Sequence, residues 1–109
     1  MPEYTFKRGK IRSAETWQVD ETSLDGPAGE SMNWAEIIEA KFADMPTGRV
    51  SVSELHLVSK FGSVKLQCND HPGGESRQIF LNMCHEITKR LEAVQPDLKF
   101  VPTAGFRFL

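Results

Sequence analysis

The sequence predicts a single α+β domain that is mainly β: a bent, barrel-like antiparallel sandwich of six or seven strands, capped by one C-terminal amphipathic helix. Three observations support this prediction. Residues 74–95 are the one long segment with helical periodicity, most of the preceding chain alternates apolar and polar residues over short stretches, and residues 52–68 carry a hairpin pattern. At 109 residues the chain fits one domain with one core.

The expected helix is defined by an apolar stripe that is suited to covering the open end of a curled sheet. The stripe has a row at four-residue spacing and three neighbours beside it: Ile79, Met83, Ile87 and Leu91, then Phe80, Cys84 and Val94. Ser76 is the expected N-cap, and Pro96 stops further helix. Lys89 and Arg90 lie near the end of a helix that favours cations.

The N-terminal part predicts short strands. Residues 4–7 and 16–19 alternate apolar and polar positions, and Leu24 extends the second strand or begins the next one. Residues 25–30 are rich in turn-forming residues, which indicates a loop at the end of a hairpin.

Residues 32–42 fit two interpretations. A helix, favoured by the Ala, Glu and Lys content, aligns Trp34, Ile37, Ile38 and Lys41. Two strands with a bend near residues 35–36 place Met32 with Trp34, and then Ile38, Ala40 and Phe42, on one face. We prefer the strands, because the alternation spans the whole segment whereas the helical stripe omits Phe42.

The next segments predict a connection and then the clearest hairpin. Residues 44–48 are turn-rich. Residues 52–59 place Leu55 and Leu57 on one face, residues 61–63 turn the chain, and residues 64–68 alternate again. Residues 69–74 form a loop that leads to the helix.

The order of these elements resembles the pleckstrin-homology-like (PH-like) superfold, and more closely the small bacterial PH-like domains. The resemblance rests on residues 16–24, the 33–37 element containing Trp34, the 55–68 hairpin and the closing helix, and it covers about residues 3 to 95. It implies a seven-stranded, strongly bent sandwich capped by its C-terminal helix and used for binding, not catalysis. Lipocalin-like or other sheet-plus-helix folds are alternatives. We therefore expect a PH-like domain over residues 1–95 and a tail over residues 96–109.

One local basic cluster is a candidate binding site for phosphate or lipid. Its residues are Lys7, Arg8, Lys10 and Arg12. Lys7, Lys10 and Arg12 can be laid over the basic pattern with which PH domains bind inositol phosphates, although residues 16–19 lack further basic residues. The alternative interpretation is a solvated surface segment or one facing an acidic membrane without specificity.

The remaining reactive residues predict no catalytic, metal or cofactor site. Cys68 and Cys84 fall at interior positions and are expected to be small buried hydrophobes, with His71 and His85 as surface imidazoles. The acidic turn of residues 20–25 offers no reason for a shifted pKa. A formal charge of -2 without a basic face argues against nucleic-acid binding.

The sequence thus predicts a non-catalytic interaction module that binds a protein partner or an anionic membrane surface. We expect a cytoplasmic location, at the inner face of a bacterial membrane if the apolar tail containing Phe106, Phe108 and Leu109 approaches a membrane segment. The alternative for the tail is docking as an edge strand. The competing function is a small enzyme or ligand carrier that uses the interior of the curled sheet, which would require a deep polar cavity instead of a filled core.

Overall fold

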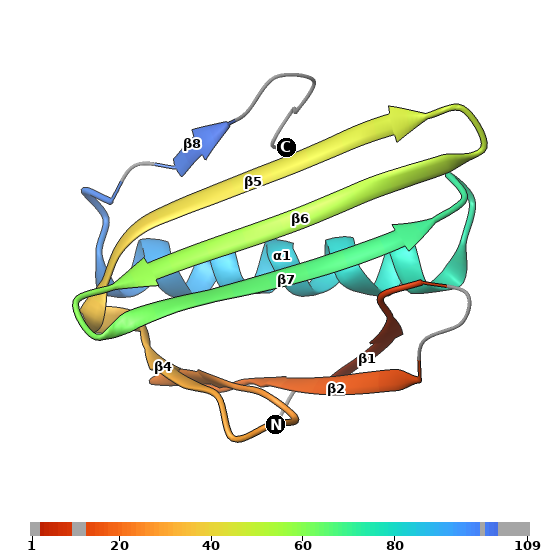
Figure 1. Cartoon of the computed structure of the whole chain (residues 1–109). Helices are drawn as coiled ribbons and strands as arrows, with labels where there is room; N and C mark the ends of the chain where they lie inside the picture. The colour runs from red at the N-terminus through yellow and green to blue at the C-terminus, as the bar shows by residue number, and fades with distance from the viewer. Residues whose placement is uncertain (1–2, 10–12, 99, 103–109) are drawn as a thin grey trace.

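A computed structural model describes residues 3–9, 13–98 and 100–102, which form two four-stranded sheets and one helix (Figure 1). The first sheet has the order β1-β2-β3-β4 and the second the order β7-β6-β5-β8. The strands of the first sheet are β1 (Glu3–Lys7), β2 (Ala14–Val19), β3 (Ser23–Asp25) and β4 (Ser31–Asn33). Those of the second are β5 (Ile37–Thr47), β6 (Val50–Ser59), β7 (Gly62–Asp70) and β8 (Phe100–Pro102). Seven strands precede the helix, so the mainly β, α+β prediction is confirmed.

The first sheet is an antiparallel meander, as the alternation of residues 4–7 and 16–19 predicts. Phe6, Trp17 and Val19 are buried on its inner face. The turn-rich residues 25–30 close the β3–β4 hairpin, where the amide of Gly26 donates to the carbonyl of Glu30 at 2.8 Å. That prediction is confirmed.

The second sheet is built around the predicted β6–β7 hairpin, which is also confirmed. The prediction for residues 44–48 is wrong in part: β5 continues to Thr47, and only the following residues turn. Pairing with β6 extends through Thr47. Pro46 is compatible with this strand because β8 pairs only with residues 40–42, so this part of β5 lies beyond the β8 pairing, where a missing amide costs little.

The preferred interpretation of residues 32–42 as strands with a bend is confirmed, with one change of face. The bend is the 3₁₀ turn η1 (Trp34–Glu36), for which the Asn33 side chain accepts a hydrogen bond from the amide of Ala35. The pairing of β5 with β6 then shifts register between Ile37 and Glu39. Because this bulge inserts a residue, Ile37 is buried with Ala40 and Phe42, while Ile38 is 55% exposed.

The helix α1 (Glu75–Val94) forms where the apolar stripe predicts it, and its row of Met83, Ile87 and Leu91 is fully buried. Two details differ from the prediction. The N-cap is Gly74, and the Ser76 hydroxyl instead accepts a hydrogen bond from the amide of Lys7 at 3.2 Å. At the other end Val94 is 43% exposed, and the last turn holds no basic residue.

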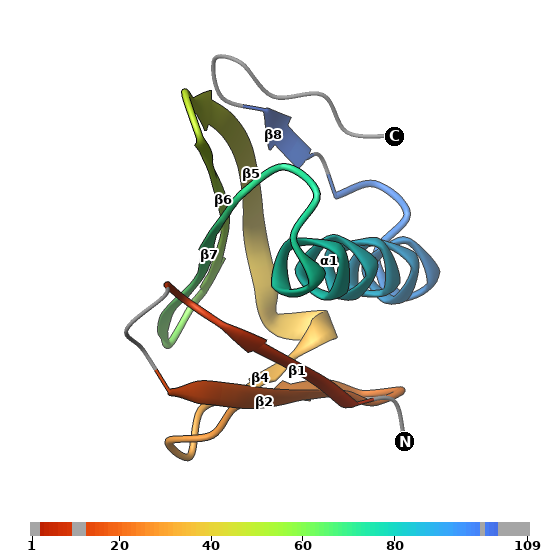
Figure 2. The ribbon, with the colours of Figure 1, turned by 90° about the vertical axis from the view of Figure 1, so that its right-hand side faces the viewer.

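The two sheets meet at an angle, and α1 lies across the open side between them (Figure 2). The arrangement is a bent sandwich and not a closed barrel. One corner is formed by η1, and at another the amide of Asn69, in β7, donates to the carbonyl of Arg8 at 2.9 Å. Both sheets and the helix contribute to one core that includes Trp17, Trp34 and Phe80. Helix α1, the one α-helix among the residues described, is not apolar enough to span a membrane.

The segment after the helix returns to the second sheet. Residues 100–102 pair in parallel with residues 40–42 of β5. The apolar residues expected to mark the tail, Phe106, Phe108 and Leu109, lie outside the described residues, so the membrane-segment hypothesis stays a prediction.

Candidate functional site

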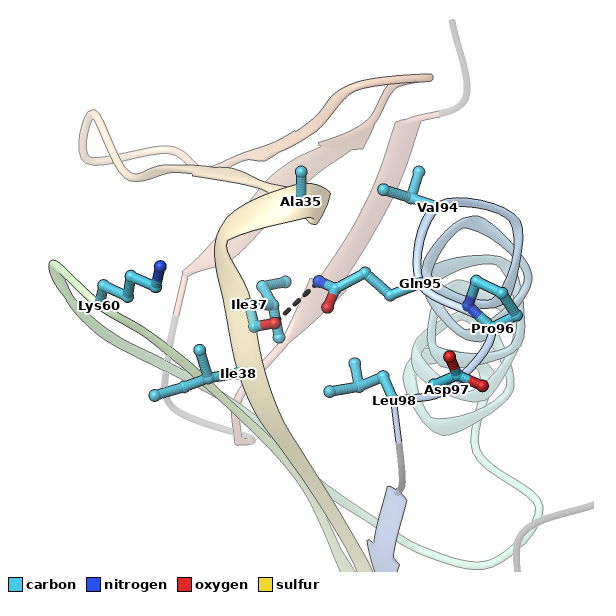
Figure 3. Close-up of a pocket in the computed structure, with 9 residues that line it drawn as sticks. All are labelled: Ala35, Ile37, Ile38, Lys60, Val94, Gln95, Pro96, Asp97 and Leu98. Carbon is cyan, nitrogen blue, oxygen red and sulfur yellow. Dashed lines mark hydrogen bonds between the residues drawn. The ribbon is translucent and has the colours of Figure 1, made fainter.

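A groove of about 560 Å³ lies where the start of β5 passes the C-terminal end of α1 (Figure 3). We call it the β5–α1 groove. Ile38 and Lys60 lie to one side of β5, and the residues after the helix lie to the other side. The lining residues are Ala35, Ile37, Ile38, Lys60, Val94, Gln95, Pro96, Asp97 and Leu98.

The wall between α1 and β5 is held by the side chain of Gln95. Its amide nitrogen donates to the carbonyl oxygens of Trp34 at 2.5 Å and of Ile37 at 2.8 Å. Trp34 is the first residue of η1, and its carbonyl also accepts a hydrogen bond from the amide of Ile37, the residue that follows the turn. The Gln95 side chain therefore fixes the end of the helix against the corner between the two sheets.

Two exposed large hydrophobic side chains line this groove. Four large hydrophobic residues are exposed in the part of the chain that the structure describes. Ile38 and Val94 line the groove, and Phe61, which is 81% exposed, follows the lining residue Lys60 in the β6–β7 turn. The fourth, Met45, is 40% exposed and does not line it. Such a local concentration of exposed apolar surface is typical of a contact site.

Two opposite charges flank the apolar part of the groove. Lys60 and Asp97 lie on opposite sides of β5. Neither side chain is in an ion pair among those found between described residues. A ligand in the groove would therefore meet a positive and a negative flank.

The predicted basic cluster is only partly described. Lys7 is exposed at the end of β1, whereas Arg8 is held by Glu15, with Nε at 2.5 Å from Oε1, and donates to the carbonyl of Lys65 at 3.2 Å. Lys10 and Arg12 lie outside the described residues. A hollow of about 180 Å³ beside Lys7 is also lined by Asp70, whose carboxylate opposes an anion. The described residues thus bring no second free cation to Lys7, and phosphate or lipid binding stays a prediction.

The cysteines lie in the interior, as predicted. Burial raises the pKa of the Cys68 thiol to about 11, and Asp70 adds to this shift. Burial also raises the pKa of Cys84 well above 9.0. His71 and His85 are exposed, and the described residues form no metal-ligating group of three or more His, Cys, Asp or Glu side chains. Both thiols are therefore protonated and weakly nucleophilic at neutral pH.

The expectation for the acidic turn between β2 and β3 is wrong. Burial, followed by a hydrogen bond to Asp25, raises the pKa of Asp20, and its Oδ1 atom has no hydrogen-bond partner. Neither Asp20 nor Asp25 lines the β5–α1 groove or the hollow beside Lys7. The carboxylate pair thus belongs to a turn, where Asp25 also accepts a hydrogen bond from the Ser23 hydroxyl at 3.1 Å.

A third hollow, of about 340 Å³, lies on the outer face of the second sheet. Lys41, His56 and Lys65 form one cross-strand row in it. Both lysines are neutralised by neighbouring carboxylates, since Lys41 pairs with Glu39 and Lys65 with Glu54, each at 2.9 Å. This row resembles an ordinary solvated sheet face.

In comparisons with known proteins, no family model, curated protein or solved structure matches the chain. Sequence reasoning missed the β5–α1 groove. Two signals could have indicated it: the adjacent Ile37 and Ile38 within an alternating strand, and the apolar Phe61 in a hairpin turn that ordinarily holds polar residues.

Proposed function

We propose that this chain is a PH-like, non-catalytic interaction module that binds a protein partner in the β5–α1 groove. The order of elements supports the PH-like assignment, since a four-stranded meander is followed by three antiparallel strands and then by a helix across the open side. The parallel strand β8 is an addition to that plan.

The filled interior favours a binding module over a small enzyme or ligand carrier. An interior site would need a polar cavity with convergent reactive groups. The side chains of the core between the sheets and α1 are instead apolar and buried, with Leu57 of β6, Leu66 of β7 and Met83 of α1 all at 0% exposure. The buried thiols are kept protonated, which removes them as nucleophiles.

The observation that carries the proposal is that two of the four exposed large hydrophobic residues, Ile38 and Val94, line one groove, and that a third, Phe61, follows the lining residue Lys60 in the chain. The opposite charges of Lys60 and Asp97 favour a protein over an anionic membrane, because a membrane surface would attract one flank and repel the other. Reduced Cys68 and Cys84 agree with a cytoplasmic setting.

Site-specific photo-crosslinking tests this proposal. A photoreactive phenylalanine analogue is placed at position 38 or 61 of the full chain in the native host, with position 45 as the control because Met45 is a similarly exposed apolar residue. The expected result is a discrete adduct with the same protein from positions 38 and 61, and none from position 45. Adducts that are absent, or identical at all three positions, would overturn it.

The membrane alternative has a separate test. The full chain is sedimented with vesicles that contain or lack anionic lipid, and compared with a variant in which Lys7, Arg8, Lys10 and Arg12 are replaced by Glu. Binding that depends on both the lipid charge and these four residues would favour the membrane surface as the ligand. Equal sedimentation of the two chains would remove the basic cluster from consideration.

A further inference from the structure

We infer that the β5–α1 groove receives an amphipathic helix of a partner protein, whose apolar stripe covers Ile38, Val94 and Leu98 and whose flanks carry an acidic group toward Lys60 and a basic group toward Asp97. This inference rests on the proposed function and specifies its ligand.

Strand addition is disfavoured because the backbone edge of β5 at the groove is already occupied. Residues 40–42 pair with β8. The carbonyls of Trp34 and Ile37 accept hydrogen bonds from Gln95. An extended peptide gains most of its affinity from main-chain hydrogen bonds to a free edge. A ligand here must therefore be recognised through its side chains.

The apolar contacts lie on both sides of β5, so a ligand has to reach across the strand. The bulge turns Ile38 outward on one side of β5, while Leu98 and Val94 lie on the side of α1. A helix places residues three and four positions apart about 5–6 Å from one another on one stripe, so two or three anchors can straddle the strand. Its backbone hydrogen bonds are satisfied internally, which suits an edge where Gln95 and β8 already occupy the carbonyls of Trp34 and Ile37 and residues 40–42.

A second copy of this chain is disfavoured as the source of the docking helix. The one helix among the described residues, α1, buries Phe80, Met83, Ile87 and Leu91 in its own core. Its apolar stripe cannot enter the groove of another copy without unfolding. Lipid is disfavoured by the flanking charges, since Lys60 and Asp97 together give the groove no net charge.

The charges of Lys60 and Asp97 predict which side of the partner helix is acidic and which is basic. A carboxylate near Lys60 and an ammonium or guanidinium near Asp97 would each gain a favourable contact, and the reversed arrangement would place like charges together. Partly exposed pairs contribute little affinity, so the apolar anchors determine strength and the charges determine orientation.

The test uses two displayed peptide libraries of equal length, one on a single-helix scaffold and one extended, selected against the full chain. Groove binders are expected from the helical library, with apolar residues at positions i, i+3 or i+4, and i+7. Their affinity should fall at least about tenfold for Val94→Asp and change little for Met45→Asp, the matched control. Circular dichroism and melting verify that both variants fold.

A charge swap then tests the orientation. Lys60→Glu should weaken the selected helix, and replacing the helix's acidic flank by Lys should restore binding. Selection of extended peptides alone, helices insensitive to Val94→Asp, or a Lys60→Glu variant that binds unchanged would each overturn the inference. So would vesicle binding or dimerisation of the chain that Val94→Asp abolishes, because these identify lipid or a second copy as the occupant.

The two proposals fail separately. If positions 38 and 61 crosslink to a protein but the helical library yields no groove binder, the helical ligand is wrong and the docking site stands. If those positions give no adduct, the docking site itself is wrong.

Discussion

The two ends of α1 differ in the contacts that their side chains make. At the N-terminal end, Asp70 accepts a hydrogen bond from the amide of Arg77 at 3.3 Å, and the Arg77 guanidinium lies 2.6 Å from the carboxylate of Asp44. A Cβ on Gly74 would collide with the Asp70 carboxylate, which would then have to move from its present position. At the C-terminal end, Val94 and Ile38 are exposed beside a groove. The first end is closed by charged and hydrogen-bonded side chains, and the second leaves apolar side chains exposed.

The largest loss of stability is expected from a change in the buried face of α1, between its two ends. Ile87→Asp places a carboxylate at a position with 0% exposure, and an unpaired buried charge costs as much as the whole stability of a small domain, about 5–15 kcal/mol. The variant should not fold, as measured by circular dichroism and thermal melting. The exposed control Lys89→Asp should fold. Unchanged melting of Ile87→Asp would contradict the assignment of α1 as the closing layer.

The closed end should depend on its ion pair. Arg77→Ala leaves Asp44 with the Ser53 hydroxyl as its remaining hydrogen-bond donor among the interactions described, and both partners of the pair are less than a quarter exposed. We expect the free energy of unfolding to fall by about 2 kcal/mol in urea titrations. Adding Asp44→Asn to Arg77→Ala should lower the free energy of unfolding only slightly further. Full additivity of the two changes would show that the pair is not coupled.

The open end should lose less stability from its own polar contact. Gln95→Ala removes the donor from the carbonyls of Trp34 and Ile37, and water can reach this partly exposed site. The expected loss is about 1 kcal/mol by urea titration. The variant Gln78→Ala, on the exposed surface of α1, is the control, since its side chain bonds only Asn82 among the described contacts. A loss larger than that of Arg77→Ala would reverse the comparison between the two ends.

The last effect is absent at neutral pH and appears only at alkaline pH. The pKa of Cys68 is about 11 in the folded chain against an ordinary 9.0, so its contribution to stability is complete below about pH 9 and is lost as the pH rises toward 11. The difference in unfolding free energy between the wild type and Cys68→Ala should therefore shrink over this range. A difference that is constant from pH 8 to about pH 11 would show that the thiol titrates normally.

The sequence predicts those parts of the fold whose pattern is local. The β6–β7 hairpin and the stripe of Met83, Ile87 and Leu91 follow from periodicity alone. Ser76 fails as the N-cap because the helix already begins after Gly74, and the carboxylate of Asp70, the last residue of β7, accepts a hydrogen bond from the amide of Arg77. Ile38 and Ile37 exchange faces because alternation assumes a fixed register, and a bulge breaks it.

The candidate site is less predictable because its parts are distant in sequence. Ile38, Lys60 and Asp97 come from a strand, a turn and the segment after the helix. Each is unremarkable in its own segment, and only folding places them around one groove. The basic cluster, by contrast, is visible in the sequence because it is continuous, yet Arg8 is used to hold Glu15.

The hydrogen bonds of Gln95 also have a mechanical meaning. Among the described residues the chain passes from one sheet to the other only at η1, and the Gln95 amide holds the carbonyls at both ends of that turn. The Gln95 side chain therefore links the end of α1 to the joint between the sheets, in addition to the packing of the helix against both of them.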